Sequence, residues 1–338
     1  MSARDARPGT DRTRATARRG TAPASPGSPP ASGDRLIVGT VPPLVPVTGL
    51  LLLLSGLAGA LAVVPAYLTV DGQELRQVRG LGSALVALLV PVVQAAVGTT
   101  LLRRRVPKFG LAYAGVAGAL GVGQLLIEAY RGVSSTSRPG VEVLAGEVVL
   151  TSGIEIGAGW VLGVVALLLT VAAAVTGTAA WGRTVMEDRG PLDPVRSSLA
   201  GATVLLGVAT VICLTVPAAD VPDQLRTDPA TGMQTVVAQE GPQALLERPG
   251  LALLGGLLLA GALLLCSVVV PSLRPRLALV GGLLALTVTV LAAGLGGLED
   301  AASSDGLEWT VAGIGLLALG PAYVLLTLGA WRARRSGG

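Results

Sequence analysis

"WTVAGIGLLALGPAYVLLTLGAW" (residues 309–331) begins and ends with tryptophan and contains no charged side chain. At a helical rise of about 1.5 Å per residue, this run is long enough to cross the hydrocarbon core of a bilayer, about 30 Å. Tryptophan is enriched at the two membrane–water interfaces. The run therefore predicts a transmembrane helix, with Trp309 and Trp331 as interfacial anchors.

The same reasoning identifies seven further apolar runs and predicts an all-α integral membrane protein, a bundle of about eight transmembrane helices. The composition agrees, because only 14% of the residues are charged, against about a quarter in a soluble domain. The predicted spans are 46–70, 81–102, 109–130, 158–181, 198–219, 250–271, 277–298 and 309–331.

The first 40 residues differ from the rest of the chain. They are rich in Arg, Pro, Ala, Ser and Gly and carry few large apolar side chains. Such a segment cannot bury enough surface to offset the entropy of ordering, so residues 1–40 are predicted to form a disordered tail. The first apolar run starts too late and is too long for a signal peptide.

Basic residues near the predicted spans are unevenly divided between the two sides, thirteen on the side of the termini against six on the other. By the positive-inside rule we expect a protein of the cell membrane with both termini in the cytoplasm. The two long outer loops are then 131–157 and 220–249. Within the first, "VEVLAGEVVLTSGIEI" (141–156) favours a small hairpin, whereas the second is predicted to be a loop or a short interfacial helix.

The four tryptophans indicate an internal repeat. Trp160 and Trp181 bracket the fourth run much as Trp309 and Trp331 bracket the eighth, and both runs end in "AW" followed closely by arginine. We expect all four to be interfacial anchors, in two parallel four-helix halves, 46–190 and 191–335, related by a pseudo-twofold axis along the membrane normal. The alternative is coincidence, because aromatic belts place tryptophan at any helix end.

Polar side chains within the spans are the candidate functional residues, because they are costly in lipid. Glu128 lies near the outer end of the third run, with Gln124 one helical turn earlier. Together they would form part of a proton or cation path. The alternative is structural, because Tyr130 and Arg131 follow at once and the Glu128 carboxylate would then reach interfacial water.

Gln94 lies near the middle of the second run, just after Pro91. It would either line a solute path or form a hydrogen bond to a carbonyl freed by the proline or to a neighbouring helix. Gln94, Gln124 and Glu128 are therefore the candidate transport path. Pro321 interrupts the eighth run in a comparable way.

Small residues recur every four positions in the third run, which predicts close helix contacts and a central place for this helix. The two series are Gly110, Ala114 and Gly118, and Gly115, Ala119 and Gly123. Cys213 and Cys266 lie at different predicted depths, too far apart for a disulfide, and are interpreted as small apolar core residues.

The chain contains no histidine, which removes the commonest general base and metal ligand. No Walker A motif is present and no serine or cysteine has a histidine base. We therefore expect no enzyme, no cofactor and no metal site. The arginines lie at the ends of the apolar runs and do not form a clustered basic surface, so we also expect no nucleic-acid partner. A carboxylate enzyme working outside is the remaining catalytic alternative. It would act through Asp71 and Glu74, or through the three glutamates of the loop after the third run, Glu142, Glu147 and Glu155.

In composition and span pattern, with "RRRVPK" (103–108) and "AAWGRTVMEDR" (179–189) as short basic connections, the chain resembles uncharacterised polytopic membrane proteins of actinobacterial type. The resemblance implies no activity. Two functions remain open: a non-catalytic accessory or assembly partner acting with the lipid bilayer and other membrane proteins, or a small-solute transporter or permease. A transporter requires Gln94, Gln124 and Glu128 to converge on one water-accessible cavity, whereas an accessory protein would disperse them among helix contacts.

Overall fold

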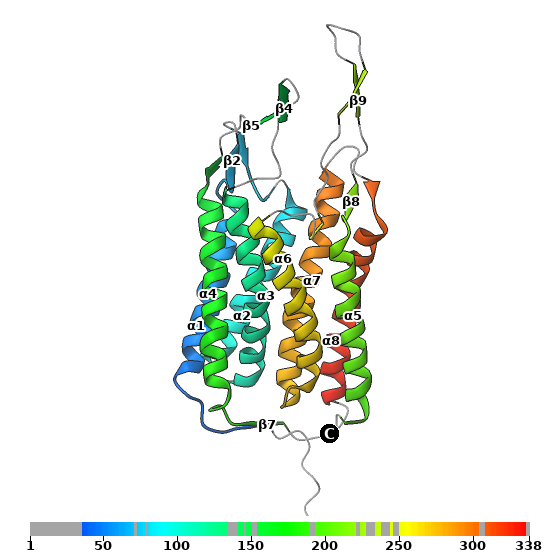
Figure 1. The fold of residues 1–338 in the computed structure, drawn as a ribbon. Helices are drawn as coiled ribbons and strands as arrows, with labels where there is room; N and C mark the ends of the chain where they lie inside the picture. Colours follow the sequence, from blue (N-terminus) through cyan, green and yellow to red (C-terminus); the bar gives the residue numbers. More distant parts are fainter. Residues whose placement is uncertain are drawn as a thin grey trace, which may run out of the picture. The chain divides into compact units, whose positions relative to one another are not determined.

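The computed structural model describes residues 36–70, 73–78, 80–133, 141–144, 147–150, 154–188, 193–220, 224–227, 234–237, 244–245, 250–303 and 308–335. Within these residues, eight helices are long and apolar enough to cross a membrane, which confirms the predicted all-α bundle (Figure 1). They are α1 Leu44–Ala62, α2 Leu81–Leu102, α3 Pro107–Val133, α4 Ala158–Trp181, α5 Asp193–Thr215, α6 Gly250–Val269, α7 Arg276–Ser303 and α8 Val311–Arg335. A short 3-10 helix, η1 Val270–Ser272, follows α6.

Short strands lie before α1 and in the connections between the helices, and all described pairings are antiparallel. β2 pairs with both β3 and β6, β1 with β7, β4 with β5, β8 with β11, and β9 with β10. Their bounds are β1 Leu36–Val38, β2 Leu68–Val70, β3 Gln73–Leu75, β4 Val141–Leu144, β5 Glu147–Leu150, β6 Ile154–Ile156, β7 Met186–Asp188, β8 Ala219–Asp220, β9 Gln224–Thr227, β10 Gln234–Val237 and β11 Glu308–Trp309.

The structure corrects the predicted ends of several elements. The first helix ends at Ala62 rather than at residue 70, because the chain turns before Pro65 and continues into β2. Residues 36–38 of the predicted tail form β1, whereas residues 1–35 lie outside the described part. Trp309 belongs to β11 and not to the last helix, since it pairs with Ala219.

The predicted hairpin in 141–156 is confirmed by the pairing of β4 with β5. The expectation of a loop or a short interfacial helix in the second outer segment, 220–249, is wrong for residues 224–227 and 234–237, which form the strand pair β9–β10, and for Asp220, which belongs to β8. Strand pairing satisfies the backbone polar groups of both segments without requiring a helix.

Large apolar side chains cover the outer surface of the helices. Leu61, Val175, Leu205 and Leu325 are each at least 60% exposed. A soluble monomer rarely exposes apolar side chains over so much of its surface. In lipid, by contrast, outward-facing leucine and valine are favourable and the helical backbone satisfies its own hydrogen bonds. The described chain is therefore a multi-pass membrane protein.

We call helices α1–α4 the first half and helices α5–α8 the second half. The helices of the two halves make corresponding contacts. α1 packs against α2 and α4, and α3 packs against α4; likewise α5 packs against α6 and α8, and α7 packs against α8. Strands β2 and β6 join the connections beside α1 and α4, and β8 and β11 join those beside α5 and α8. The division into repeats 46–190 and 191–335 stays a prediction, to which these parallels lend support.

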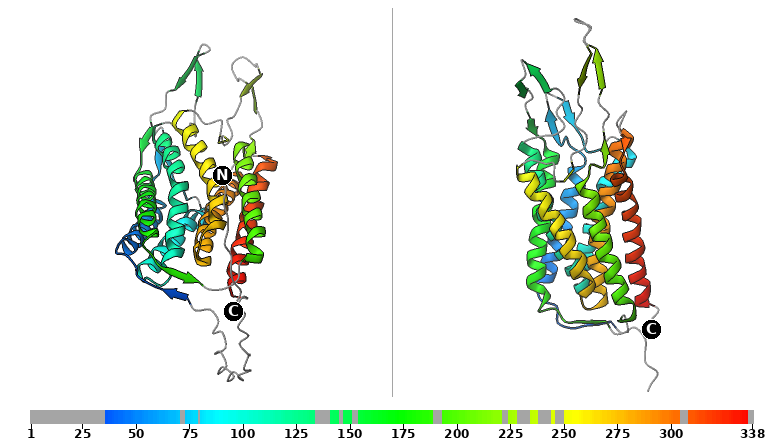
Figure 2. Two further views of the ribbon diagram at one scale, coloured as in Figure 1. Left: turned by 60° about the horizontal axis from the view of Figure 1, so that its bottom comes forward. Right: turned by 45° about the vertical axis from the view of Figure 1, so that its right-hand side comes forward.

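The two halves meet through α3 and α7, the most buried of the eight spans, with further contacts from α3 to α6 and from α2 to α7 (Figures 1 and 2). Glycines allow the close approach: a Cβ on Gly123 would lie 2.6 Å from the carbonyl oxygen of Gly255 in α6. The predicted central place of the third helix is confirmed. Gly115 differs, because a Cβ there would meet no atom within 4 Å.

Candidate functional site

A cavity of about 550 Å³ lies between the two halves. Helices α1 to α4 contribute one part of its wall, and α5, α6 and α7 contribute the other. Its lining extends along α3 from Arg131 to the fully buried Tyr113, and it includes the exposed Gln77 in the connection before α2. Glu128 and Lys108 lie toward opposite ends of α3, so we call the two ends of the bundle the Glu128 end and the Lys108 end. We call this cavity the central cavity. Because the exposed Gln77 is part of its lining, the central cavity reaches solvent at the Glu128 end.

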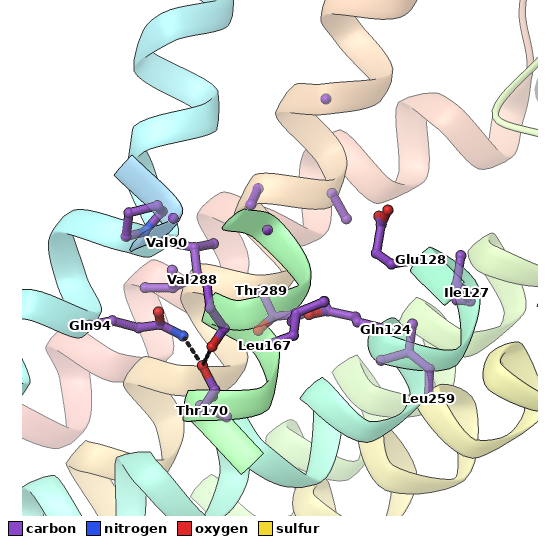
Figure 3. A pocket seen from close by; sticks show the side chains of 18 of the residues that line it. Val90, Gln94, Gln124, Ile127, Glu128, Leu167, Thr170, Leu259, Val288 and Thr289 are labelled. Carbon is purple, nitrogen blue, oxygen red and sulfur yellow. Dashed lines mark hydrogen bonds between the residues drawn. The ribbon is translucent and has the colours of Figure 1, made fainter. Parts of the chain in front are cut away.

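All three residues of the predicted path line this central cavity. Gln94 comes from α2, and Gln124 and Glu128 come from α3. Figure 3 shows Gln94 beside Thr170 in one part of the wall and Gln124 with Glu128 in another. Thr99 and Thr100, two other polar residues of the second run, instead donate to carbonyl oxygens of their own helix. The three residues that the sequence singled out therefore converge, together with further polar residues such as Tyr67, Thr170 and Thr289.

Gln94 joins three helices at the inner part of the cavity. Its Oε1 accepts a hydrogen bond from Ser55 of α1 at 3.0 Å. Its Nε2 donates to Thr170 Oγ1 of α4 at 3.2 Å (Figure 3). The hydroxyl oxygens of Ser55 and Thr170 are 2.7 Å apart, and all three side chains are buried. Gln94 therefore bonds to neighbouring helices rather than to a carbonyl freed by Pro91, and it also lines the cavity.

Glu128 is held from two sides at the mouth of the cavity. Arg131 Nη1 donates to Glu128 Oε1 at 2.8 Å, and the Tyr67 hydroxyl donates to Oε2. Burial, together with the nearby Glu128 carboxylate, raises the pKa of Tyr67, so the phenol keeps the proton that it donates. Trp160 Nε1 donates to the backbone oxygen of Glu128 at 2.9 Å. The carboxylate is therefore an ion-paired group, with a side chain that is 21% exposed.

Gln124 lies between these two polar clusters. It forms no hydrogen bond with any residue of the described segments, so its amide can donate to and accept from a bound molecule. Glu128 and Arg131 are the only charged groups among the described residues that line the cavity, and they pair with each other. The lining is therefore electrically balanced, with apolar walls and a few polar groups, as is typical of small-molecule sites.

Sequence reasoning missed part of this arrangement. Ser55 and Thr170 are hydroxyl residues within apolar runs. A search that included hydroxyl groups would have found them, together with others in the same runs such as Thr48 and Thr176. Tyr67 lies beyond the end of α1, in a stretch that the hydropathy pattern assigned to the first span. Its role depends on the pairing of β2 with β6, for which the sequence carries no local signal.

Replacing Gln94 by leucine should lower the free energy of unfolding by about 1 kcal/mol, because the variant loses two hydrogen bonds between helices. Without Gln94, Ser55 can donate its single hydroxyl proton to the backbone oxygen of Ala166, 2.7 Å away, which limits the loss. Thermal unfolding in detergent measures the difference. The matched control is Gln124→Leu, which removes the same group without breaking a described hydrogen bond. Equal costs for the two variants would contradict the network.

The other predicted features contribute less to this site. The described residues contain no group of three or more His, Cys, Asp or Glu side chains placed to hold a metal ion. Cys213 and Cys266 are both free thiols. At the Lys108 end, the Lys108 ammonium lies 5.5 Å from the centroid of the Trp181 ring. The depth of the four tryptophans in a membrane stays a prediction. No family model, no curated protein and no solved structure matches this chain.

Proposed function

We propose that this protein is a non-catalytic small-solute transporter or permease and that its solute binds in the central cavity. The observation that carries the proposal is the convergence of Gln94, Gln124 and Glu128 on that cavity. Transporter sites commonly lie near the membrane midplane between two structural halves. The volume of the cavity falls in the range of about 300–1,000 Å³ that small-molecule sites occupy.

The charge of the lining favours an uncharged or zwitterionic solute. A net charge buried in a low-dielectric cavity needs a partner of opposite sign, and Glu128 and Arg131 already neutralise each other. A neutral polar molecule would instead exchange hydrogen bonds with the free amide of Gln124 and the side chain of Thr289, both of which line the cavity. The apolar walls would accept its carbon skeleton.

Passage through the membrane would require the bundle to open toward its Lys108 end. There Tyr113 is fully buried, and Gly281 of α7 lies directly against the backbone of Phe109. In the orientation proposed from the basic residues, with both termini in the cytoplasm of a cell-membrane protein, the cavity faces outward. The described state would then be the outward-open state of an alternating-access cycle.

Solute binding to the purified protein tests this proposal. Thermal stability in mild detergent is measured against a panel of sugars, polyols and amino acids, since a ligand that binds only the folded state raises the unfolding temperature. The cavity-filling variant is Gly163→Leu: Gly163 lines the cavity, and a Cβ there meets no atom within 4 Å. Gly201→Leu in α5 adds the same side chain at an equally open position outside the lining.

We expect at least one uncharged or zwitterionic solute to stabilise the native protein and the Gly201→Leu variant but not the Gly163→Leu variant. Uptake of that solute into liposomes containing the protein then distinguishes transport from binding alone. A panel with no such solute, or a solute that stabilises both variants equally, would contradict the assignment of the site.

A second candidate is an accessory or assembly role, and the strand pairs β4–β5 and β9–β10 favour it. These pairs lie in the two longest connections, and a partner protein would recognise a paired strand more readily than an unstructured loop. Co-purification from mild detergent distinguishes the two candidates. A stoichiometric partner that is lost when residues 224–237 are deleted would favour the accessory role.

A further inference from the structure

A second cavity, of about 360 Å³, lies at the Lys108 end of the bundle, on the face of α3 where α4 and α6 pack against it. We call it the Lys108 groove. Gly115 of α3 leaves it open, and Gly177, Trp181, Leu265 and Cys266 contribute to its wall. It does not share a lining residue with the central cavity. Its lining is almost entirely apolar, so it fits a hydrocarbon ligand rather than a polar solute.

The groove is bordered by the surface that lipid covers. Leu265 is 68% exposed and its neighbours Val268 and Val269 are also exposed, so the wall formed by α6 continues directly into the outer apolar surface. A hydrocarbon chain can therefore enter from the side without crossing a polar region. Gly115 makes the groove deeper, because it has no side chain and a Cβ at this position would meet no atom within 4 Å.

A cation lies at one end of the groove. Lys108 is the only lysine of the chain, and it precedes the lining residues Leu111 and Ala112 by one helical turn on the same face of α3. Its ammonium is near the ring of Trp181, which lines the groove. Because α3 begins at Pro107, the positive end of its helix dipole lies there too. The end of the groove is thus suited to an anionic group.

From this juxtaposition we propose that the Lys108 groove binds an anionic phospholipid, with one acyl chain along the groove and the phosphate at the Lys108 ammonium. Basic side chains between transmembrane helices are a recurrent means of binding anionic headgroups. The apolar lining supplies the affinity for the acyl chain, and Lys108 supplies the preference for a negative headgroup. This site is independent of the function proposed for the central cavity.

The test uses the delipidated full-length protein in mild detergent, with phosphatidylglycerol and phosphatidylcholine of identical acyl chains as probes. The unfolding temperature is measured as each lipid is titrated. We expect phosphatidylglycerol to bind more tightly, by about fivefold for a single cationic contact. Lys108→Gln should abolish this preference, whereas Arg332→Gln, which removes a positive charge from α8 at the same end, should leave it intact.

A second variant separates the acyl chain from the headgroup. Gly115→Leu fills the groove without a backbone clash and should weaken the binding of both lipids, whereas Gly201→Leu should not. In a Cys213→Ser background, phosphatidylglycerol should slow the reaction of Cys266 with an apolar maleimide, and Gly115→Leu should remove this protection. Equal binding of the two lipids to the native protein, or undiminished phosphatidylglycerol binding by Gly115→Leu, would overturn the proposal.

Discussion

Replacing Gly123 by leucine is expected to lower the free energy of unfolding by about 3 kcal/mol, the upper part of the usual range for overpacking. The Cβ would lie 2.6 Å from the oxygen of Gly255 and 2.7 Å from the nitrogen of Leu259. Both atoms are backbone, so neither can move aside without shifting α6. Because α3 and α6 join the two halves, the variant should also disturb the wall of the central cavity.

Thermal unfolding in lipid-free detergent measures this effect, with Gly115→Leu as the control. Both substitutions place the same side chain in the same helix and gain the same helix propensity, but Gly115 faces open space. The difference between the two variants therefore reports the α3–α6 contact. If Gly123→Leu unfolds at the same temperature as Gly115→Leu, the two helices are not as close as described.

Replacing Glu128 by alanine should lower the free energy of unfolding by about 2 kcal/mol. The variant loses two hydrogen bonds to a charged acceptor, from Tyr67 and Arg131, and such bonds contribute about 1.5–3 kcal/mol each before solvent exposure reduces them. The Arg131 side chain is 47% exposed, so its share is the smaller one. Tyr67 should contribute more, because its phenol is largely buried.

A double-mutant cycle isolates the ion pair. Arg131→Ala alone and Glu128→Ala alone each leave a charge without its partner at the mouth of the cavity, whereas the double variant leaves none. We therefore expect the double variant to be more stable than the sum of the single effects predicts, by about 0.5–1 kcal/mol. Strictly additive effects in thermal unfolding would show that the pair contributes nothing.

The bilayer is the reason that the number and type of the helices could be predicted from the sequence. A membrane-spanning segment must be long, apolar and internally hydrogen-bonded, so each span is visible in the sequence as a long run of apolar residues. The ends of the elements were less predictable. "VVPAYLTV" (63–70) is as apolar as the helix before it, yet it turns away because β2 pairs with β6, a contact between segments far apart in the chain.

Some members of the candidate site could be predicted, but its arrangement could not. Gln94, Gln124 and Glu128 were identifiable because polar groups are rare in apolar runs. Hydropathy carries no information about how each helix is rotated, so their convergence on one cavity depends on packing. Small residues such as Gly123 determine that packing. Their four-residue spacing can be seen in the sequence, but the helix that packs against each glycine cannot.

The accessibility of α3 to water tests the central cavity most directly. In a background with Cys213→Ala and Cys266→Ala, a single cysteine is introduced by Ala117→Cys or by Ala119→Cys. Ala117 lines the central cavity, whereas Ala119 lies at almost the same depth on the exposed surface of α3, outside the lining. Both variants, reconstituted in liposomes, are treated with a small charged thiosulfonate reagent.

We predict rapid modification of Ala117→Cys, slow modification of Ala119→Cys, and protection of Ala117→Cys by the added substitution Gly163→Leu. A thiolate forms readily where water enters and not in contact with lipid. If Ala117→Cys reacts as slowly as Ala119→Cys, water does not reach the cavity, and a solute path through Gln94, Gln124 and Glu128 is contradicted.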